Sequence, residues 1–289
     1  MKRIRVLLSI AALGAGTLGL AACGGDDGDT SASGTGTAAA SCEKGSLKLT
    51  TAGTLTIGTD NPAYPPWFAD NTPSNGKGYE SAVAYAIAKK MGFADNEVKW
   101  VTVPFNTAIA PSAKKFDFDV NQISISDDRR KAVDFSSGYY DVRQAVVTYK
   151  GSPIDGKTAV ADLKGAKLGA QVGTTSYTAI KDQIQPSDGP AVYDSNDLAV
   201  QALKNKSIDG IVVDLPTAFY MTAAQLDDGV IVGQLPAADG ATEQFGAVLD
   251  KGSPLTPCVT QAVDALREDG TLADLEKQWL SSQGAPELK

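Results

Sequence analysis

The sequence predicts an α/β protein with two lobes, and three observations support this fold class. From Thr54 onward, strand-like and helix-like patterns alternate, which is typical of parallel sheets joined by crossover helices. The order of strand, turn and helix recurs before and after about residue 145. Cys42 and Cys258, if bonded, return the end of the chain to its first section. We therefore expect a discontinuous first lobe, a continuous second lobe inserted in it, and two strands that cross between them.

Length and composition exclude several classes of protein. The 289 residues suffice for two domains, and 43% apolar residues suffice for a core. The net charge of −8 is opposite to that expected of a nucleic-acid-binding protein. The absence of histidine removes histidine-based catalytic triads and histidine-ligated metals, and three cysteines cannot form a four-cysteine metal site. We expect no catalytic residue, no cofactor, no metal and no nucleic-acid partner.

Residues 1–22 have the layout of a signal peptide. The apolar run Val6–Leu20 is short for a membrane span, and it ends in Leu20-Ala21-Ala22-Cys23, which resembles the bacterial lipobox. The alternative is a plain signal peptide followed by an incidental cysteine. Residues 23–45 are expected to be a lipidated cysteine and a flexible linker. The protein would then be exported and anchored to the outer face of the cell membrane through Cys23.

Two cysteines remain once Cys23 is lipidated, and they allow a single pairing, Cys42 with Cys258. Export permits oxidation, and a disulfide that closes so long a loop contributes roughly 2–5 kcal/mol. The alternative is two separate buried thiols.

The elements of the first section follow from periodicity. Alternating apolar and polar residues indicate strands at Leu55–Thr59 and Phe118–Ser126, and Val98–Val103 is also strand-like. Gly78–Gly92 is expected to be a helix, because its apolar residues recur every four positions and a glycine can end it.

The second section repeats the pattern with shorter elements. Hydrophobic runs indicate strands, and apolar residues at helical spacing indicate helices. In chain order we expect a strand at Ala166–Val172, a helix at Thr175–Ile184, a strand at Ala191–Tyr193, a helix at Asp197–Leu203, a buried strand at Ile211–Val213 followed by Pro216 and another helix, and a last strong helix at Cys258–Leu266.

Three sites have residues that suit a zwitterion, and the first surrounds Arg129. Ser124 and Ser126 would point the same way on a strand, and Arg129 follows at the start of a helical turn. The planar guanidinium group of arginine fits a carboxylate. The alternative is a capped surface helix, with Asp127 and Asp128 near its start and a solvated Arg129.

The second site is Gly173-Thr174-Thr175-Ser176, where a strand opens into a helix. Free backbone N–H groups at such a point favour an anion, although ordinary helix capping explains the same residues. The Gly-Lys-Ser/Thr end of a phosphate-binding loop is missing.

The third site is Asp214, directly after a buried strand. A carboxylate at this position is costly unless it meets a partner, and a ligand ammonium group is one such partner. The alternative is a cap for the following helix, which has Pro216 near its start.

Aromatic residues lie in two loops near these sites. Tyr64, Trp67 and Phe68 follow Asp60 in a proline-rich loop, and Phe105 follows a proline. Aromatic side chains in loops can stack on the side chain of a ligand. For Trp67 and Phe68, packing within a lobe is the alternative.

These sites, in this order, resemble bacterial solute-binding protein family 3, the amino-acid receptors of ABC importers. The resemblance covers nearly all of residues 46–280. Its motifs are Gly78-Tyr79-Glu80-Ser81-Ala82-Val83, the run from Asn121 to Arg129, Val133-Asp134-Phe135-Ser136 with Tyr139-Tyr140, Leu163-Lys164-Gly165, the run from Gly173 to Ser176, the run from Ile208 to Asp214, and the ending from Asp269 to Leu280. The first motif is incomplete, because Ala82 replaces a usual acidic residue. The pair Asn121-Gln122 resembles the cystine-binding branch.

The resemblance implies a periplasmic-binding-protein-like fold of type II, in which two lobes close over a ligand in the cleft between them. Lobe 1 would comprise residues 46–142 plus 246–285, and lobe 2 would comprise residues 143–245. The two hinge strands would lie near residues 141–143 and 241–245. A monomer is the family expectation.

The resemblance also implies a role for each ligand-binding residue. Arg129 would hold the ligand carboxylate with help from Ser124 and the N–H of Thr175, and Asp214 would hold the ammonium group. Tyr64 and Phe105 would enclose the side chain, Asp60 and Thr174 would line the site, and Gln122 would contact the far end of the ligand or narrow the pocket.

The function that this implies is an extracytoplasmic lipoprotein that captures a free L-amino acid, polar or cystine-like, by hinge closure. The protein would deliver it to an ABC permease in the membrane. Two other classes stay open. One is a dehydratase-like enzyme on the same scaffold, with Glu80, Asp60 or a lysine as acid or base. The other is the ligand-sensing subunit of a signalling system.

Overall fold

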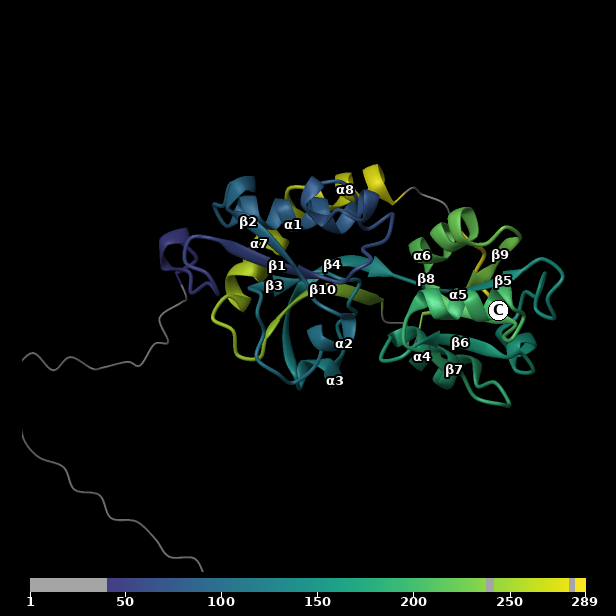
Figure 1. Ribbon diagram of the computed structural model, residues 1–289. Helices are drawn as coiled ribbons and strands as arrows, with labels where there is room; N and C mark the ends of the chain where they lie inside the picture. Colours follow the sequence, from purple (N-terminus) through teal and green to yellow (C-terminus); the bar gives the residue numbers. More distant parts are fainter. Residues whose placement is uncertain (1–40, 238–241, 281–283) are drawn as a thin grey trace, which may run out of the picture. The chain divides into compact units, whose positions relative to one another are not determined.

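The computed structural model describes residues 41–237, 242–280 and 284–289. The signal peptide, Cys23 and the linker up to residue 40 lie outside these residues. The described strands form two five-stranded sheets, and helices pack on each of them (Figure 1). The α/β fold with two lobes, which the sequence predicted, is therefore confirmed.

The first lobe is built from the elements on both ends of the described chain. Its strands are β1 (Leu55–Thr59), β2 (Val98–Thr102), β3 (Phe118–Asp119), β4 (Val133–Val142) and β10 (Glu243–Asp250). Its α-helices are α1 (Tyr79–Lys90), α2 (Phe105–Ala108), α3 (Asp127–Arg130), α7 (Thr256–Glu268) and α8 (Thr271–Trp279). Short 3₁₀ turns lie at Lys44–Ser46, Ala69–Asn71, Pro73–Asn75 and Asp95–Glu97.

The second lobe is built from the middle of the chain. Its strands are β5 (Gln144–Tyr149), β6 (Leu168–Gln171), β7 (Ala191–Tyr193), β8 (Gly210–Asp214) and β9 (Gly229–Gln234). Its α-helices are α4 (Thr175–Ala179), α5 (Asn196–Lys204) and α6 (Leu215–Tyr220). Single π-helical turns at Ile180–Ile184 and Met221–Gln225 extend α4 and α6, and a 3₁₀ turn lies at Val160–Leu163.

Both sheets are mixed, which corrects the expectation of parallel sheets. The orders are β2-β1-β3-β10-β4 and β7-β6-β8-β5-β9, and β10 and β5 run antiparallel to their neighbours. The reason lies in the crossings between the lobes. Only Arg143 separates β4 from β5, so this strand passes directly from the first sheet into the second. The returning strand β10 pairs with β4 and therefore runs in the opposite direction.

The expected strand at Phe118–Ser126 is wrong beyond its first two residues. Gln122 has a φ of 49°, in the left-handed region, so extended pairing cannot continue through it. Ser124 forms only a single bridge with Phe245. Ser126 instead begins the next helix, because its hydroxyl accepts a hydrogen bond from the backbone N–H of Arg129. The two serines therefore do not share one face of a strand.

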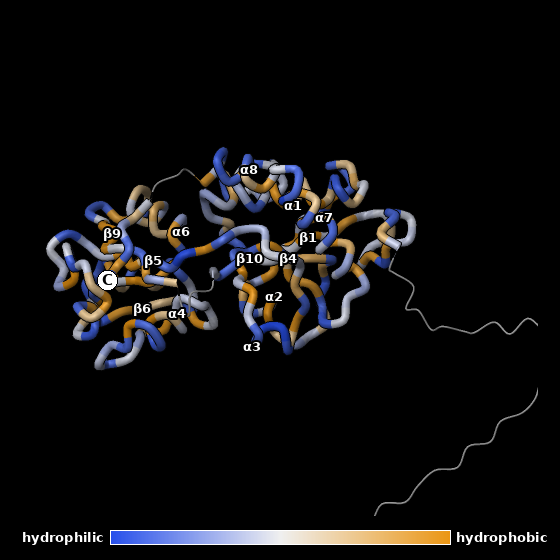
Figure 2. The backbone as a smooth tube through the Cα atoms, turned by 180° about the vertical axis from the view of Figure 1, so that it is seen from behind, coloured by the Kyte–Doolittle hydropathy of each residue, from blue (hydrophilic) through white to orange (hydrophobic). Residues whose placement is uncertain are grey.

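Each sheet buries apolar side chains on both of its faces. In the first lobe, α1, α7 and α8 cover one face, and α2 and α3 lie on the other (Figure 1). In the second lobe, α5 and α6 pack on one face and α4 on the other. The strands inside the lobes carry many of the residues that Figure 2 colours as hydrophobic. The row of apolar residues expected along α1 is fully buried at Val83 and Ile87.

A disulfide joins Cys42 to Cys258, two residues that are 216 positions apart. This is the pairing that the cysteine count predicted. It attaches the segment before β1 to helix α7, so the beginning and the end of the first lobe are covalently linked.

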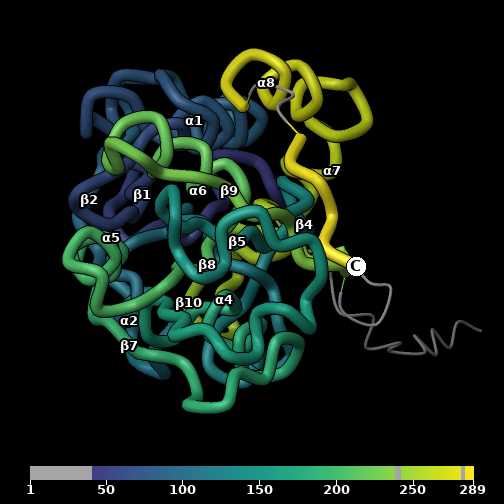
Figure 3. Tube along the Cα trace, turned by 90° about the vertical axis from the view of Figure 1, so that its right-hand side faces the viewer, coloured from purple at the N-terminus to yellow at the C-terminus, as the bar shows by residue number. Residues whose placement is uncertain are grey.

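The last residues leave the first lobe and pack on the second, which the sequence did not predict. The N–H of Gln234 donates to the carbonyl oxygen of Pro286, and the N–H of Leu288 donates to that of Gln234, both at 2.8 Å. The N–H of Val160 donates to the carbonyl oxygen of Lys289 at 2.9 Å. Leu288 is buried in a core cluster of the second lobe. Residues of α4 belong to the same cluster. Figure 3 shows this yellow end of the chain below α8.

Candidate ligand-binding site

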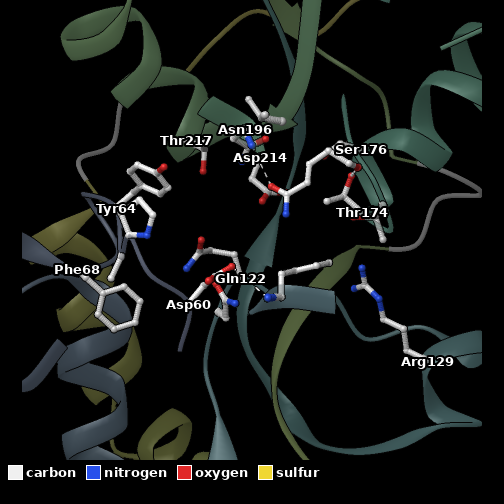
Figure 4. Close-up of a pocket in the computed structure, with 17 residues that line it drawn as sticks. Asp60, Tyr64, Phe68, Gln122, Arg129, Thr174, Ser176, Asn196, Asp214 and Thr217 are labelled. Carbon is white, nitrogen blue, oxygen red and sulfur yellow. Dashed lines mark hydrogen bonds between the residues drawn. The ribbon is translucent and has the colours of Figure 1, made fainter. Parts of the chain in front are cut away.

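One pocket gathers residues from both lobes, and eight of the nine expected ligand contacts line it (Figure 4). These are Asp60, Tyr64, Phe105, Gln122, Arg129, Thr174, Thr175 and Asp214. The ninth, Ser124, does not line the pocket, but its hydroxyl lies 3.2 Å from that of Thr175. Ser176, from the second expected site, also lines it, as do four polar residues to which sequence reasoning gave no ligand role, namely Asn121, Gln171, Asn196 and Thr217.

Arg129 reaches the pocket from a short capped helix. Ser126 caps α3, and Asp127 is exposed in its first turn, so the surface-helix alternative is correct for these two residues. It is wrong for Arg129, whose guanidinium donates from Nη1 to the carbonyl oxygen of Ser124 at 2.6 Å. A second hydrogen bond runs from Nη2 to the carbonyl oxygen of Gly173, in the other lobe, at 2.9 Å. The side chain is thus held by both lobes.

The surroundings of Arg129 set its electrostatics. Burial lowers the pKa of Arg129, while the negative charges of Glu243 and Asp214 raise it. Arginine stays protonated at any ordinary pH, so a positive charge is present in the pocket. The guanidinium carbon also lies 5.5 Å from the centre of the Phe105 ring, within reach of a cation–π contact.

The segment from Gly173 to Ser176 contains an ordinary helix cap and also borders the pocket. Gly173 has a φ of 76°, which a residue with a side chain rarely adopts, and its carbonyl oxygen accepts from Arg129. The hydroxyl of Thr174 accepts from the N–H of Tyr177 at 3.2 Å, so Thr174 is an ordinary helix cap. Thr174 and Thr175 nevertheless both line the pocket.

Asp214 stands at the N-cap position of α6, but its side chain accepts no hydrogen bond from that helix. The capping alternative is therefore wrong for its carboxylate. Oδ1 instead accepts from Nε2 of Gln144 at 2.9 Å. Burial and the nearby charge of Glu243 hold the pKa of Asp214 well above its usual range, while Gln144 and Arg129 act in the opposite direction.

Gln144 and Glu243 complete the polar network at the crossings between the lobes. Nε2 of Gln144 lies 3.3 Å from Oε2 of Glu243, and its Oε1 accepts from the hydroxyl of Ser176 at 2.7 Å. Gln144 begins β5 and Glu243 begins β10. Sequence reasoning missed both residues. The one available signal was position, because Glu243 lies within the expected hinge segment 241–245 and Gln144 directly follows the other one, and neither residue belongs to a recognisable motif.

The aromatic loop before α1 places Tyr64 at the boundary between the lobes. Its hydroxyl donates to Oδ2 of Asp197, at the start of α5, over 2.5 Å. Burial, and then the hydrogen bond to Asp197, raise the pKa of Tyr64. The ring centre of Tyr64 lies 6.3 Å from that of Tyr220. Tyr64 therefore contacts the second lobe at two positions.

Trp67 and Phe68, in the same loop, belong to the core of the first lobe. Each is about 1% exposed, which confirms packing as their main role, although Phe68 also borders the pocket. The loop is held close to α1 at Gly78, where an added Cβ would lie 2.5 Å from the carbonyl oxygen of Trp67. The N–H of Glu80 donates to that same oxygen at 3.0 Å.

Asp60 and Gln122 border the pocket from the first lobe. Asp60 follows β1 and uses Oδ2 to accept from the N–H of Phe105 at 3.1 Å. Gln122 is held by Glu80, whose Oε1 accepts from the backbone N–H of Gln122 at 2.7 Å. Nε2 of Gln122 donates to Oε2 of the same carboxylate. Glu80 is fully buried, and burial raises its pKa to about 7 in spite of these hydrogen bonds.

The described residues contain no group of three or more His, Cys, Asp or Glu residues arranged to hold a metal ion. None of the helices among residues 41–237, 242–280 and 284–289 is both long enough and apolar enough to span a membrane.

Comparisons with known proteins identify a matching family. Residues 55–282 match the profile of the bacterial extracellular solute-binding proteins, family 3. The chain is 29% identical to the L-cystine-binding protein TcyJ of Escherichia coli (strain K12) over 81% of this chain and 85% of that protein. It is 28% identical to an L-arginine-binding protein of Pseudomonas aeruginosa over 82% of this chain and 95% of that protein.

Solved structures show the same fold. An ancestral arginine-binding protein bound to glutamine superposes with a TM-score of 0.66 at 30% identity, and the match covers 80% of this chain and all of that one. An ancestral amino-acid-binding protein described as a precursor of cyclohexadienyl dehydratase superposes with a TM-score of 0.62 at 29% identity, over 78% and 95% of the two chains.

Proposed function

Because the chain belongs to the bacterial extracellular solute-binding proteins, family 3, we propose that it captures one free L-amino acid and delivers it to an ABC permease. The observation that carries this proposal is the meeting of Arg129, from the first lobe, with Asp214, from the second, in one pocket. Opposite charges from different lobes match the two ends of a zwitterion.

Desolvation of the two pocket charges favours a ligand that carries a charge at both ends. Arg129 would hold the carboxylate, with the hydroxyl of Ser124 and the backbone N–H of Thr175 nearby, and Asp214 would hold the ammonium group. Each charge of the pocket gains a partner when the ligand is bound. If either ligand end were missing, a partly desolvated charge would stay unpaired, which disfavours molecules that lack one of the two groups.

Capture by hinge closure follows from the same arrangement. A ligand shifts a protein towards one conformation only if it binds that conformation better. A zwitterion that contacts both lobes does so only when the lobes approach each other. Movement would concentrate at Arg143, between β4 and β5, and at the beginning of β10, because these are the described crossings nearest the pocket.

The lining favours a polar or cystine-like side chain. Beyond the two charges, Gln122, Gln171, Asn196 and Thr217 offer hydrogen-bonding groups, and Tyr64 and Phe105 offer aromatic surface. The relatives include a cystine-binding and an arginine-binding protein, and cystine and arginine both carry polar groups at the far end of the side chain.

We propose capture without chemical conversion. The carboxyl groups that line the pocket are Asp60 and Asp214. Both oxygens of Asp60 already accept backbone N–H groups, so this residue is poorly placed to transfer a proton. Glu80 does not line the pocket. Mass spectrometry of a ligand incubated with the protein should recover it unchanged, and a dehydrated product would instead favour the enzyme.

Lipid anchoring is part of the proposal and depends on the lipobox-like Leu20-Ala21-Ala22-Cys23. We expect cells grown with labelled palmitate to label the protein, and Cys23→Ser to abolish the label and release the protein from membranes. Co-purification with a permease, rather than with a sensor kinase, would support delivery for import.

The central test is a thermal-shift screen of the purified protein against L-amino acids and cystine, after unfolding and refolding to remove any carried ligand. A ligand present at a hundred times its dissociation constant adds about 2.7 kcal/mol to stability, which raises the melting temperature measurably. We expect at least one hit, which Arg129→Ala abolishes and Arg130→Ala, a matched change of an exposed neighbour, preserves. A folded protein that gives no hit would overturn the proposal.

A further inference from the structure

We propose that Glu80 is a positioning residue that fixes the orientation of Gln122, and that Gln122 thereby selects amino acids whose side chains donate hydrogen bonds. This inference rests on the proposed function, because it concerns the ligand of the same pocket.

Glu80 holds both the backbone and the side chain of Gln122 by hydrogen bonds. Both carboxylate oxygens of Glu80 are occupied by one residue, Oε1 by the backbone N–H of Gln122 at 2.7 Å and Oε2 by its side-chain Nε2. The hydroxyl of Tyr139 donates to Oε1 as well, at 2.5 Å. Glu80 has no exposed surface, so water does not compete for these bonds.

The backbone of Gln122 supports the same conclusion. Its φ of 49° lies in the left-handed region, which residues other than glycine seldom occupy without a stabilising contact. The hydrogen bond from its N–H to Glu80 is such a contact. Backbone and side chain are therefore both fixed by a single buried carboxylate.

The consequence is a defined polarity at the pocket wall. A side-chain amide has a donor end and an acceptor end, and Glu80 takes the donor end of Gln122. Within the described residues, Oε1 of Gln122 has no hydrogen-bond partner. This oxygen is not fully buried, so it keeps some exposed surface. Because Gln122 lines the pocket, its free acceptor is available to a ligand.

The surrounding charges act in the same direction. Asp60 and Asp214 line the pocket, and Arg129 is the one positive side chain among the described lining residues. A ligand that places its α-carboxylate on Arg129 leaves no cation for a second carboxylate. A side-chain carboxylate would meet the oxygen of Gln122 and nearby negative charge, whereas an N–H group would be attracted to both.

The side-chain amide of Gln171 is held in the reverse orientation, and this does not alter the preference for ligands with N–H donors. Its Oε1 accepts from the backbone N–H of Asn196 at 3.2 Å, so its Nε2 is the end left to donate. Side-chain amides and carboxylates both contain an oxygen that can accept from Nε2. Discrimination between them therefore falls to Gln122. Arginine, histidine, lysine, glutamine, asparagine and cystine, with its second ammonium group, belong to the favoured class.

The test measures dissociation constants by calorimetry for the complete chain, purified in detergent, against all L-amino acids and cystine. L-glutamine and L-glutamate, and L-asparagine and L-aspartate, provide matched pairs of nearly equal shape. We expect the tightest ligand to carry a side-chain N–H donor and to bind at least tenfold more tightly than L-glutamate. Glu80→Gln frees the amide of Gln122 to turn and should reduce this preference at least fivefold.

Two further variants show whether Glu80 acts by orienting Gln122 or only through its own negative charge. In a Gln122→Ala background, Glu80→Gln should change the preference less than twofold, because the residue through which it acts is gone. Tyr139→Phe removes the third hydrogen bond to Glu80 without touching Gln122. It should lower the melting temperature and leave the preference unchanged. If Glu80→Gln fails to fold, Gln122→Ala alone must reduce the preference by a similar factor.

The outcomes are distinguishable. Tightest binding of glutamate or aspartate, or an equal effect of Glu80→Gln with and without Gln122, overturns the inference but leaves the proposed function standing. Absence of binding by any amino acid to the wild-type protein overturns both. A preference that survives Gln122→Ala overturns the role assigned to Gln122.

Discussion

Tyr64 in the first lobe and Asp197 in the second are joined by a hydrogen bond of 2.5 Å, although 133 positions separate them in the sequence. The bond lies at the pocket, which Tyr64 lines. It connects the two lobes without involving either crossing strand. Holding the lobes together near a ligand should lengthen the time for which the ligand stays bound.

Tyr64→Phe removes this bond and keeps the ring. A hydrogen bond to a charged group contributes about 1.5 kcal/mol or more, so ligand affinity should fall roughly tenfold, mainly through faster dissociation. Stopped-flow measurement of the dissociation rate checks this. Asp197→Asn should have a similar effect, and the double variant should add little to either change. An unchanged dissociation rate in Tyr64→Phe would contradict the prediction.

Arg129→Ala should weaken ligand binding by about 2–5 kcal/mol, because the ligand carboxylate and the pocket then keep an unpaired charge. Isothermal titration calorimetry measures the loss directly. Arg130→Ala is the matched control, since Arg130 is exposed on the same short helix. Equal losses in the two variants would show that general positive charge, rather than the held guanidinium of Arg129, attracts the ligand.

Asp214 should make binding depend on pH. Burial, followed by the charge of Glu243, raises the pKa of Asp214 well above its usual range. When the pH falls through this raised value, the carboxylate is protonated and loses its attraction for an ammonium group. Affinity should therefore decrease on acidification, beginning above the range usual for aspartate. Asp214→Asn should bind weakly at every pH, with a flatter profile, whereas exposed Asp127→Asn should keep the wild-type profile.

Glu80 should make the stability of the fold decrease with pH. Burial raises its pKa from 4.5 to about 7, so between these values the folded state binds a proton that the unfolded state has released. The stability that this proton provides is present below pH 4.5 and is lost as the pH approaches 7. At about 1.4 kcal/mol per unit, the loss is on the order of 3 kcal/mol.

The measurement is urea unfolding from pH 4.5 to 8 for the wild type and Glu80→Gln. Groups far from Glu80 titrate equally in both proteins, so the difference between them reports Glu80 together with buried neighbours such as Asp119, whose pKa the charge of Glu80 raises. Wild-type stability should fall relative to that of the variant as the pH rises, and then level off. A constant difference across this range would show that Glu80 does not titrate there.

The Cys42–Cys258 disulfide should stabilise the fold without affecting ligand choice. It closes a loop of more than two hundred residues, and its loss should cost roughly 2–5 kcal/mol. We expect Cys42→Ser with Cys258→Ser to unfold at lower urea concentration and to rank ligands as the wild type does. A reductant should destabilise the wild type and leave the double variant unaffected. A changed ranking would indicate that the disulfide shapes the pocket.

Sequence reasoning identified those residues of the pocket that stand in short local motifs. Arg129 follows a serine-rich turn, Gly173 opens a helix, and Asp214 ends a buried strand, so each is visible within a few residues. All three line the pocket or contact it. Their ligand roles stay predictions, but their convergence shows that local patterns carry most of the information about where they lie.

The remainder depends on contacts between distant segments. Gln144 is an ordinary polar residue in the sequence, and it becomes the centre of a network only because β5 begins beside Asp214 and Glu243. The left-handed Gln122 interrupts a run that alternates like a strand, since its contact with buried Glu80 outweighs the pattern. The antiparallel strands follow from the crossings, which periodicity within one segment cannot reveal.

Residues 286–289 limit when the second lobe can complete its packing during synthesis. They supply backbone partners to Gln234 and Val160 and place Leu288 in the core of the second lobe. The first lobe likewise needs β10 and α7, which come after nearly all of the second. A nascent chain that ends at residue 242 can therefore complete neither lobe. The first lobe can therefore reach its native packing only after α7 has emerged, and the second lobe only after residues 286–289 have emerged.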